Sequence, residues 1–342
     1  MSQSARTLGA QTTTVQLRSA DLTGAAMEIS HSNLTAFAAD RVNLPADRAQ
    51  NHRDQVNRLR DRLQAKIDDD PSFALVKMLH AGSVAKGTGL RTVDDLDVAV
   101  YVRRTDVPSQ DDRELVSWLA DRLDEANPNM SRDQFIEQQH TVKIEFRGTG
   151  LDVDVVPVLY DGADDDRGDL INRNTGERVE TSVKLHLQFI RSRKTKCGPQ
   201  YAELIRLTKW WKRHALKSHP DLRMKSFIIE LIWAHLAENG TSLSDYPEAL
   251  ESFFVHLVKR PEKPIAFTDF GPAPSPTDAP MQIIDPVNPD NNIAKDYTIN
   301  DRNRISDAAM EALSAIQEAR FAPTKGRELE LWQRIFGSSF RG

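Results

Sequence analysis

The hydrophobic pattern of the chain changes near residue 175. Before that point, short runs rich in β-branched residues alternate with polar positions, which predicts strands between amphipathic helices. A Gly148-Thr149-Gly150 segment between two such runs predicts a hairpin. The elements predicted for this half are helices at residues 46–66 and 113–125 and strands at residues 73–80, 96–102, 142–147 and 151–159.

After residue 175 the apolar positions recur with helical spacing, and the most apolar of these segments contains FIIELIWAHL. Eight of the seventeen prolines lie between Pro261 and Pro289, which predicts an irregular loop or linker. The helices predicted here are residues 183–191, 201–217, 225–238, 248–259, 303–321 and 325–336.

This order of elements predicts an α+β protein with a mixed sheet first and a helical half second. The predicted units are an N-terminal arm or short first helix at residues 1–40, a sheet-containing lobe at residues 41–175 and a helical lobe at residues 176–342.

Composition narrows the class of protein. With 342 residues and 39% hydrophobic residues, the chain is long enough for one large core or two small ones. No segment approaches the roughly 18 consecutive apolar residues of a membrane span, and residues 1–10 lack the apolar core of a secretory signal. The single cysteine, Cys197, excludes an internal disulfide and any zinc site with two thiolates. These features predict a soluble, cytoplasmic protein.

The net charge of −5 argues against a general nucleic-acid coat, but basic residues concentrate between Lys184 and Lys217. A local basic run in an acidic protein suits a phosphate ligand better than a long polyanion. The alternative for each of these residues is a solvated helix face.

A phosphate-binding turn is predicted at Gly82-Ser83, directly after a predicted strand. Glycine lets a ligand approach the backbone, and a serine hydroxyl with neighbouring amides can hold a phosphate. Lys86 would add a positive charge. Alone, this is an ordinary glycine-serine turn.

Two acid-x-acid pairs add metal chemistry. Asp95 and Asp97 open one predicted strand, and Asp152 and Asp154 lie in another. Residues two apart on a strand share a face, so each pair converges on one spot. Like charges this close repel unless a cation lies between them. Three such acids predict two Mg²⁺ or Mn²⁺ ions about 3.5–4 Å apart, as in nucleotidyl transfer. Spacing leaves open whether Asp152 or Asp154 is the third ligand. The alternative to a metal site is that these acids are solvated at the edge of a strand.

Residues 82–102 (GSVAKGTGLRTVDDLDVAVYV) resemble the glycine-serine and acid-x-acid signature of polymerase β-like nucleotidyltransferases. The similarity is to the oligoadenylate synthetase and cGAS branch, in particular the bacterial, DncV-like CD-NTases of CBASS anti-phage defence. It continues through residues 151–159, 204–214, 225–240 and 283–294, and so covers about residues 45–320.

The resemblance implies two lobes with the active site in the cleft between them. It implies metal ligation by Asp95, Asp97 and Asp154, which also makes them the catalytic residues. The residues that it implies for nucleotide binding are Gly82, Ser83, Lys86, Lys209, Ser226, Phe227 and Asn292, with Asn291 beside the last. Simpler alternatives remain for three of them: a surface lysine at 209, a helix N-cap at Ser226 and a core aromatic at Phe227.

The function implied is synthesis of a cyclic di- or trinucleotide second messenger from nucleoside triphosphates, with ATP among them and GTP or another triphosphate as a further substrate. The product would activate a separate effector, and a regulatory partner protein and a monomeric enzyme are expected. Without further cysteines, the zinc ribbon that cGAS uses to sense DNA is absent from the sequence. The alternatives are a linear 2′-5′-oligoadenylate synthetase and a nucleotide-binding regulatory pseudoenzyme. Base choice, ring size and linkage do not follow from these motifs.

Overall fold

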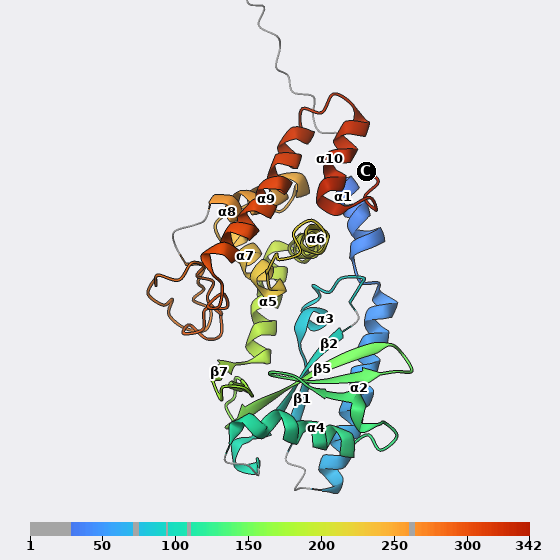
Figure 1. Cartoon of the computed structure of the whole chain (residues 1–342), viewed down its shortest axis with the longest axis vertical. Coiled ribbons are helices and arrows are strands. Elements are labelled where there is room, and N and C mark those ends of the chain that lie inside the picture. Colours follow the sequence, from blue (N-terminus) through green and yellow to red (C-terminus); the bar gives the residue numbers. More distant parts are fainter. Residues whose placement is uncertain (1–28, 71–74, 94, 108–110, 260–263) are drawn as a thin grey trace, which may run out of the picture.

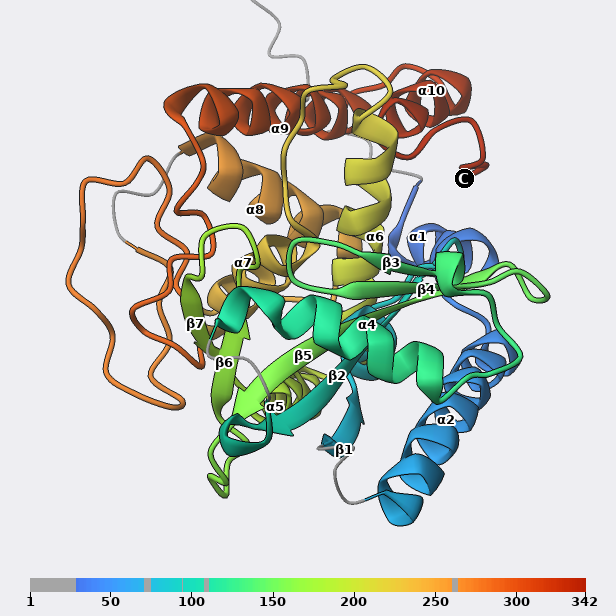
Figure 2. The ribbon, with the colours of Figure 1, turned by 60° about the horizontal axis from the view of Figure 1, so that its bottom comes forward.

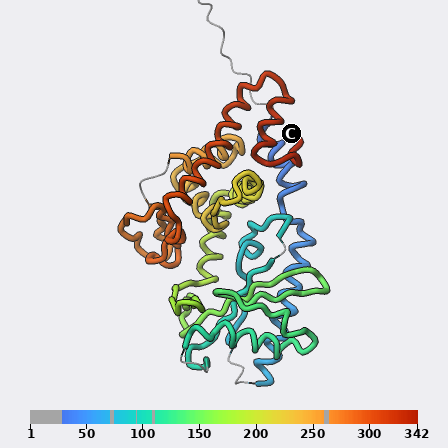
Figure 3. The backbone as a smooth tube through the Cα atoms, viewed as in Figure 1, coloured from blue at the N-terminus to red at the C-terminus, as the bar shows by residue number. Residues whose placement is uncertain are grey.

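The computed structural model describes residues 29–70, 75–93, 95–107, 111–259 and 264–342 (Figure 1). A sheet-containing lobe occupies one end of the molecule and a helical lobe the other, and the chain path between them is clearest in the tube view (Figure 3). Most of the N-terminal arm that the sequence predicted lies outside the described residues.

The first lobe is built on a seven-stranded mixed sheet. Its central path has the order β1-β2-β5-β4-β3, and β6 joins β5 to β7 at the side. β2 and β5 are parallel, and the other pairs are antiparallel. The strands are β1 (Leu75–His80), β2 (Asp95–Arg103), β3 (Phe135–Glu137), β4 (Val142–Phe146), β5 (Leu151–Tyr160), β6 (Gly168–Ile171) and β7 (Arg178–Thr181).

One face of this sheet carries the core of the lobe. The helices α2 (Ala46–Asp69) and α4 (Leu115–Glu125) cover it, and α4 crosses the strands in Figure 2. From β2, the even-numbered Leu96, Val98 and Val100 enter this core. Because successive side chains of a strand alternate between faces, the odd-numbered Asp95 and Asp97 lie on the opposite face. The apolar alternation of β2 therefore fixes where the acids point.

The second lobe has its own, larger core, formed where its helices pack on one another. Its helices are α5 (Val183–Cys197), α6 (Pro199–Ala215), α7 (Ser226–Glu238), α8 (Tyr246–Lys259), α9 (Ile299–Ala319) and α10 (Lys325–Phe336). The first described helix, α1 (His31–Phe37), continues into a π-helical turn (Ala38–Val42) and also packs into this core. Phe37, for example, lies 5.1 Å from Phe340 between ring centroids. The first described helix therefore packs in the helical lobe, although it precedes the sheet-containing lobe in the sequence.

The predicted α+β class and the long elements are confirmed, including the hairpin of β4 and β5. The segment after β1 was predicted as a break, but residues Gly82–Lys86 form a short helix, α3. Three short strands, β3, β6 and β7, were not predicted, because three or four residues are too few for a periodic signal. The predicted domain boundaries stay predictions. None of the helices described is long and apolar enough to cross a membrane.

Candidate active site

The acidic residues come together through the register of two strands. β2 and β5 pair in parallel, with Asp97 directly opposite Asp154 and Asp95 opposite Asp152. Neighbouring strands in a sheet lie about 4.8 Å apart, so paired side chains on one face are close. The sheet therefore brings Asp97 and Asp154 side by side, with Asp95 one step along the same face.

The electrostatics of these acids fit a cation. Burial raises the pKa of Asp97, and the nearby Asp95 raises it further. Burial, followed by the charges of Asp97 and Asp95, raises the pKa of Asp154 to about 6. The Asp154 Oδ1 atom is buried without a hydrogen-bond partner among the described residues. Unpaired, mutually repelling carboxylate oxygens are the donor set that Mg²⁺ or Mn²⁺ prefers.

The side chains do not already form a closed metal cage. Within the described ranges, no three His, Cys, Asp or Glu side chains are grouped closely enough to hold an ion. Asp95 in particular is exposed. The chemistry of the donor atoms thus fits a metal ion. Their arrangement is a pair of adjacent acids, Asp97 and Asp154, with Asp95 beside them.

The choice between Asp152 and Asp154 becomes clear from their neighbours. Asp152 Oδ2 forms a 2.6 Å ion pair with Lys143 Nζ on β4. Asp154 has no such partner for Oδ1 among the described residues, and it faces Asp97. Asp154 is therefore the acid that remains available to a ligand.

The glycine-serine turn lies directly against these acids. Gly82 has a φ of +65°, and a Cβ atom added there would fall 1.6 Å from Asp97 Oδ2. The backbone N–H of Ser83 donates a hydrogen bond to the Asp97 carboxylate, and this bond opposes the rise of its pKa. Only glycine allows this close approach. The turn and the first acid pair, twelve residues apart in sequence at Ser83 and Asp95, thus form one site.

A cavity of about 530 Å³ opens beside the turn, between the two lobes. Its lining combines the turn, Asp95 and Asp97 of the first lobe with basic residues of α6 and the start of α7. The lining residues are Gly82, Ser83, Lys86, Thr88, Leu90, Thr92, Val93, Asp95, Asp97, Lys209, Lys212, Arg213, Leu216, Ser226, Phe227 and Glu230. Of the predicted nucleotide-binding residues, six line this one cavity: Gly82, Ser83, Lys86, Lys209, Ser226 and Phe227.

The two predicted lysines share an unpredicted partner. Glu230 Oε1 accepts a hydrogen bond from Lys209 Nζ at 2.6 Å, and Glu230 Oε2 accepts one from Lys86 Nζ at 3.0 Å. Burial alone would raise the pKa of Glu230, but the charges of Lys209 and Lys86 lower it to about 2. Burial lowers the pKa of Lys209, against the opposing effect of Glu230. Lys209 is thus a buried, paired lysine, and the surface-lysine interpretation is wrong.

Ser226 and Phe227 lie at the start of α7. The N-cap of this helix is Lys225, so the N-cap interpretation of Ser226 is wrong by one residue. The Ser226 hydroxyl instead accepts a 3.2 Å hydrogen bond from Lys212 Nζ. Phe227 is half-buried, and Lys86 Nζ lies 4.2 Å from its ring centroid. Phe227 lines the cavity, where an aromatic ring can contact a planar ligand.

Asn292 is not among the residues that line this cavity. Its Nδ2 donates to the Met281 carbonyl at 2.8 Å, and its Oδ1 accepts from the backbone N–H groups of Ile283 and Ala294. Neighbouring Asn291 donates to Asp285 Oδ2. Both asparagines therefore stabilise the proline-rich loop, and the nucleotide contact at Asn292 stays a prediction.

Sequence reasoning missed Thr88, Lys212 and Glu230 in the cavity wall. Lys212 follows Lys209 by three residues, and Glu230 follows Ser226 by four. Residues three or four apart share a helix face, so this spacing could have identified both. Thr88 lies in the turn after α3 and carries no periodic signal.

Comparison with known proteins is consistent with this geometry. The family described as Second Messenger Oligonucleotide or Dinucleotide Synthetase matches residues 27–193. A cyclic AMP-AMP-AMP synthase of Escherichia coli (strain MS 115-1) is 47% identical over 317 residues, which cover 92% of this chain and 98% of the relative. A CBASS oligonucleotide cyclase, CdnC, of E. coli (strain KTE188) is 28% identical over 320 residues, with the same coverage of both chains.

Solved structures of E. coli MS115-1 CdnC have the same fold. The structure described as containing ATP superposes with a TM-score of 0.86, and the structure of its complex with HORMA-deltaN superposes with 0.85. Each is 47% identical and covers 92% of this chain and 99% of the other.

Proposed function

The chain belongs to the second messenger oligonucleotide or dinucleotide synthetase family, and we propose that it joins three ATP molecules into a cyclic trinucleotide. It is a nucleotidyltransferase and a cyclic oligonucleotide synthase of the CBASS type. The finer assignment, three AMP units in the ring, rests on the 47% identity to a cyclic AMP-AMP-AMP synthase over nearly the whole of both chains. The observation that carries the chemistry is the pairing of Asp97 with Asp154 beside the Gly82-Ser83 turn.

Asp97 and Asp154, with Asp95 beside them, would hold Mg²⁺ or Mn²⁺. The bound ions would supply the positive charge that offsets the charge developing on the attacking and leaving oxygens. The fit rests on the orphaned Asp154 Oδ1 and on the raised pKa of both paired acids.

The chain's own cations would bind the triphosphate. Lys86 and Lys212 both line the cavity, and Ser83 and Ser226 offer hydroxyl groups from opposite walls. Together they would align the α-phosphate of one ATP with the ribose hydroxyl of the next. The new P–O bond then forms as the bond to pyrophosphate breaks, without a covalent bond to the protein. Phe227, in the same wall, would contact the base.

Product analysis tests this function. Purified protein is incubated with Mg²⁺ and ATP, then with the other nucleoside triphosphates singly and in pairs. We expect pyrophosphate release and a phosphatase-resistant product whose mass equals three AMP residues without terminal groups. Linear, phosphatase-sensitive oligomers would favour an oligoadenylate-type synthetase, and a two-unit ring would overturn the product assignment. Binding of ATP without pyrophosphate release under all conditions would favour a regulatory pseudoenzyme.

A regulatory partner is part of the same proposal. The structure of the E. coli relative with HORMA-deltaN supports a HORMA-type protein as that partner. If so, adding a HORMA-type protein encoded with this chain will increase product formation, and the two will co-elute in gel filtration. The product's effector stays a prediction.

A further inference from the structure

Glu230 lines the same cavity as the proposed phosphate-binding residues, and it is 2% exposed. It lies on α7, one helical turn after Ser226. Its Oε1 accepts from Lys209 Nζ at 2.6 Å and from Thr88 Oγ1 at 2.7 Å. Its Oε2 accepts from Lys86 Nζ at 3.0 Å. One carboxylate thus connects the first lobe, through Lys86 and Thr88, to the helical lobe.

The two lysines at this carboxylate have different capacities for a ligand. An ammonium group has three N–H donors. Lys209 directs all three to Glu230 Oε1, the Thr88 carbonyl and Thr88 Oγ1, and its side chain is 5% exposed. Lys86 makes one hydrogen bond within the described part of the chain, to Glu230, and its side chain is 13% exposed. Lys86 therefore has donors for a phosphate, and Lys209 has none to spare.

Side chains of the helical lobe also donate hydrogen bonds to three successive backbone carbonyl oxygens at the end of α3. Lys194 Nζ donates to the Lys86 carbonyl at 3.4 Å, Arg206 Nη1 to the Gly87 carbonyl at 2.6 Å, and Lys209 Nζ to the Thr88 carbonyl at 3.2 Å. All three cations come from α5 and α6, and α3 packs against α5 (Figure 1). The helical lobe thus fixes the end of α3, and with it the position from which Lys86 extends.

We propose that Glu230 is a positioning residue, which ties Lys86 to the helical lobe so that its ammonium faces the phosphates of the bound nucleotide. Lys209 has the same positioning role in place of direct phosphate contact. This inference rests on the proposed nucleotide site, since it names the group that orients one of its cations.

A carboxylate suits this role better than a neutral group. Two ammonium groups close to one another repel, and a buried ammonium without a counter-charge is strongly destabilising. Glu230 compensates one positive charge and leaves the other for the nucleotide. Its two oxygens also hold the lysines on separate sides, which a single hydroxyl could not do. Lys86 is held in place before the ligand arrives, so less of its rotamer freedom is lost on binding.

The test is a double-mutant cycle that uses Mg²⁺ and a non-hydrolysable ATP analogue, with binding measured by calorimetry. Glu230→Gln keeps the shape of the side chain and removes its charge. We expect it to weaken binding about tenfold, in the range of a lost charged hydrogen bond. Because Glu230 acts through Lys86, the change should have little further effect in a Lys86→Ala background. An unchanged affinity, or an effect fully additive with Lys86→Ala, overturns the proposal.

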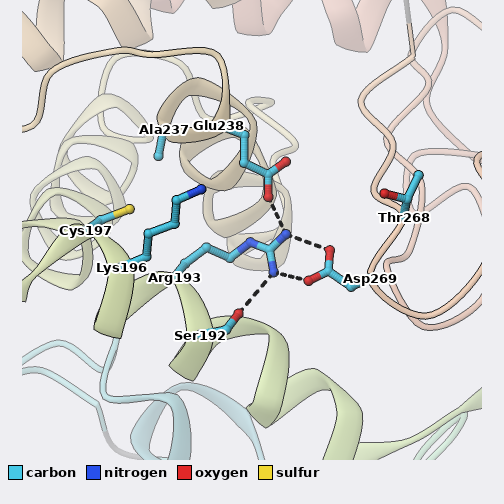
Figure 4. A pocket seen from close by; sticks show the side chains of 8 residues that line it. All are labelled: Ser192, Arg193, Lys196, Cys197, Ala237, Glu238, Thr268 and Asp269. Carbon is cyan, nitrogen blue, oxygen red and sulfur yellow. Dashed lines mark hydrogen bonds and ion pairs between the residues drawn. The ribbon is translucent and has the colours of Figure 1, made fainter.

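Glu238→Gln is the matched control. Glu238 lies about two turns further along α7 and also pairs with a buried cation, Arg193, at a second cavity of about 350 Å³ (Figure 4). Arg193 keeps a second acidic partner, Asp269, at 2.6 Å. The Glu238 variant should therefore bind the analogue like the wild type. A loss of affinity equal to that of the Glu230 variant would mean that any charge change on α7 is enough, and would overturn the proposal.

A second variant covers failure of Glu230→Gln to fold. Replacing both Lys209 and Glu230 with Met removes the buried pair together, which proteins often tolerate. This variant should fold and still bind the analogue about tenfold more weakly, because Lys86 is no longer held. Wild-type affinity would show that Glu230 only neutralises Lys209. Analogue binding by the wild type without pyrophosphate release would overturn the proposed function while leaving this inference in place.

Discussion

Asp97 and Asp154 are register partners on adjacent parallel strands, and burial together with their neighbouring acids raises the pKa of both. Their pairing costs stability, since a carboxyl group whose folded pKa exceeds its unfolded value destabilises the folded state at neutral pH. Function explains why the sequence keeps both.

Asp97→Asn and Asp154→Asn should therefore separate activity from stability. We expect each to lower product formation at least about a hundredfold, because a charged ligand for the metal is lost. We also expect the melting temperature of the nucleotide-free protein at pH 7 to stay the same or rise, because the repulsion is removed. Pyrophosphate release and thermal unfolding measure the two effects.

Asp152→Asn is the control for this pair. Asp152 shares the face of Asp154 but is paired with Lys143. The variant should keep most of its activity. If Asp152→Asn is inactive and Asp154→Asn is active, the third acid has been assigned to the wrong position.

Gly82→Ala should abolish activity through a steric clash. The added Cβ would lie 1.6 Å from Asp97 Oδ2 and 2.6 Å from Asp97 Cβ, so rotation of the Asp97 side chain cannot relieve the contact. Either the turn or the acid must move. Gly150→Ala is a matched comparison, since Gly150 has the same φ of +65° but no atom within 4 Å of the added Cβ.

The Gly150 variant should lose about 1 kcal/mol of unfolding free energy, from the backbone conformation alone, and keep its activity. Urea unfolding and pyrophosphate release measure both variants. Equal activity of the Gly82 variant and the wild type would mean that the turn does not have to approach Asp97.

Parts of this site follow from local sequence and parts do not. Alternation along β2 was enough to place Asp95 and Asp97 on one face, because the apolar Leu96 and Val98 specify the other. The register that sets Asp97 against Asp154 depends on a pairing between strands more than fifty residues apart, for which no local pattern exists.

Two residues show where sequence spacing was not enough to place a side chain. Lys209 looks like a surface lysine by periodicity, and only the packing of α6 against α7 gives it a buried partner in Glu230. Asn292 follows a family motif, but its hydrogen bonds close a loop whose path depends on eight prolines and their neighbours. Contacts between elements determined both outcomes, so sequence spacing could not.

Lys212 gives a prediction for a residue that the sequence did not single out. Its ammonium donates to Ser226 Oγ and to the Met224 carbonyl, at the start of α7 where the triphosphate would lie. Lys212→Met should raise the KM for ATP about tenfold with a smaller change in kcat, because the charge acts on the bound triphosphate throughout the reaction. Steady-state pyrophosphate release gives both constants. Lys217→Met, at an exposed position beyond the end of α6, is the control and should leave both unchanged. An unchanged KM in the Lys212 variant would remove this lysine from the phosphate site.

The half-buried pair of histidines on α7 and α8 predicts acid sensitivity of the helical lobe. The rings of His235 and His256 lie 5.3 Å apart between centroids. Burial, with a further contribution from His235, lowers the pKa of His256 to about 4. Between that value and the ordinary value near 6.5, the unfolded chain binds a proton that the folded chain does not. The free energy of unfolding is therefore fully retained above about pH 6.5 and decreases as the pH falls toward 4.

From pH 7 to pH 5, His256 should account for a loss of about 2 kcal/mol, since each pKa unit corresponds to about 1.4 kcal/mol. Urea unfolding across this range measures the loss, and His256→Gln should reduce it because glutamine does not titrate. His219→Gln is the control, because His219 lies outside this pair and contacts Glu311. Comparing the His256 and His219 variants with the wild type separates the contribution of His256 from that of carboxyl groups that titrate in the same range. A stability profile that His256→Gln leaves as steep as that of the wild type would show that another group controls the acid response of this lobe.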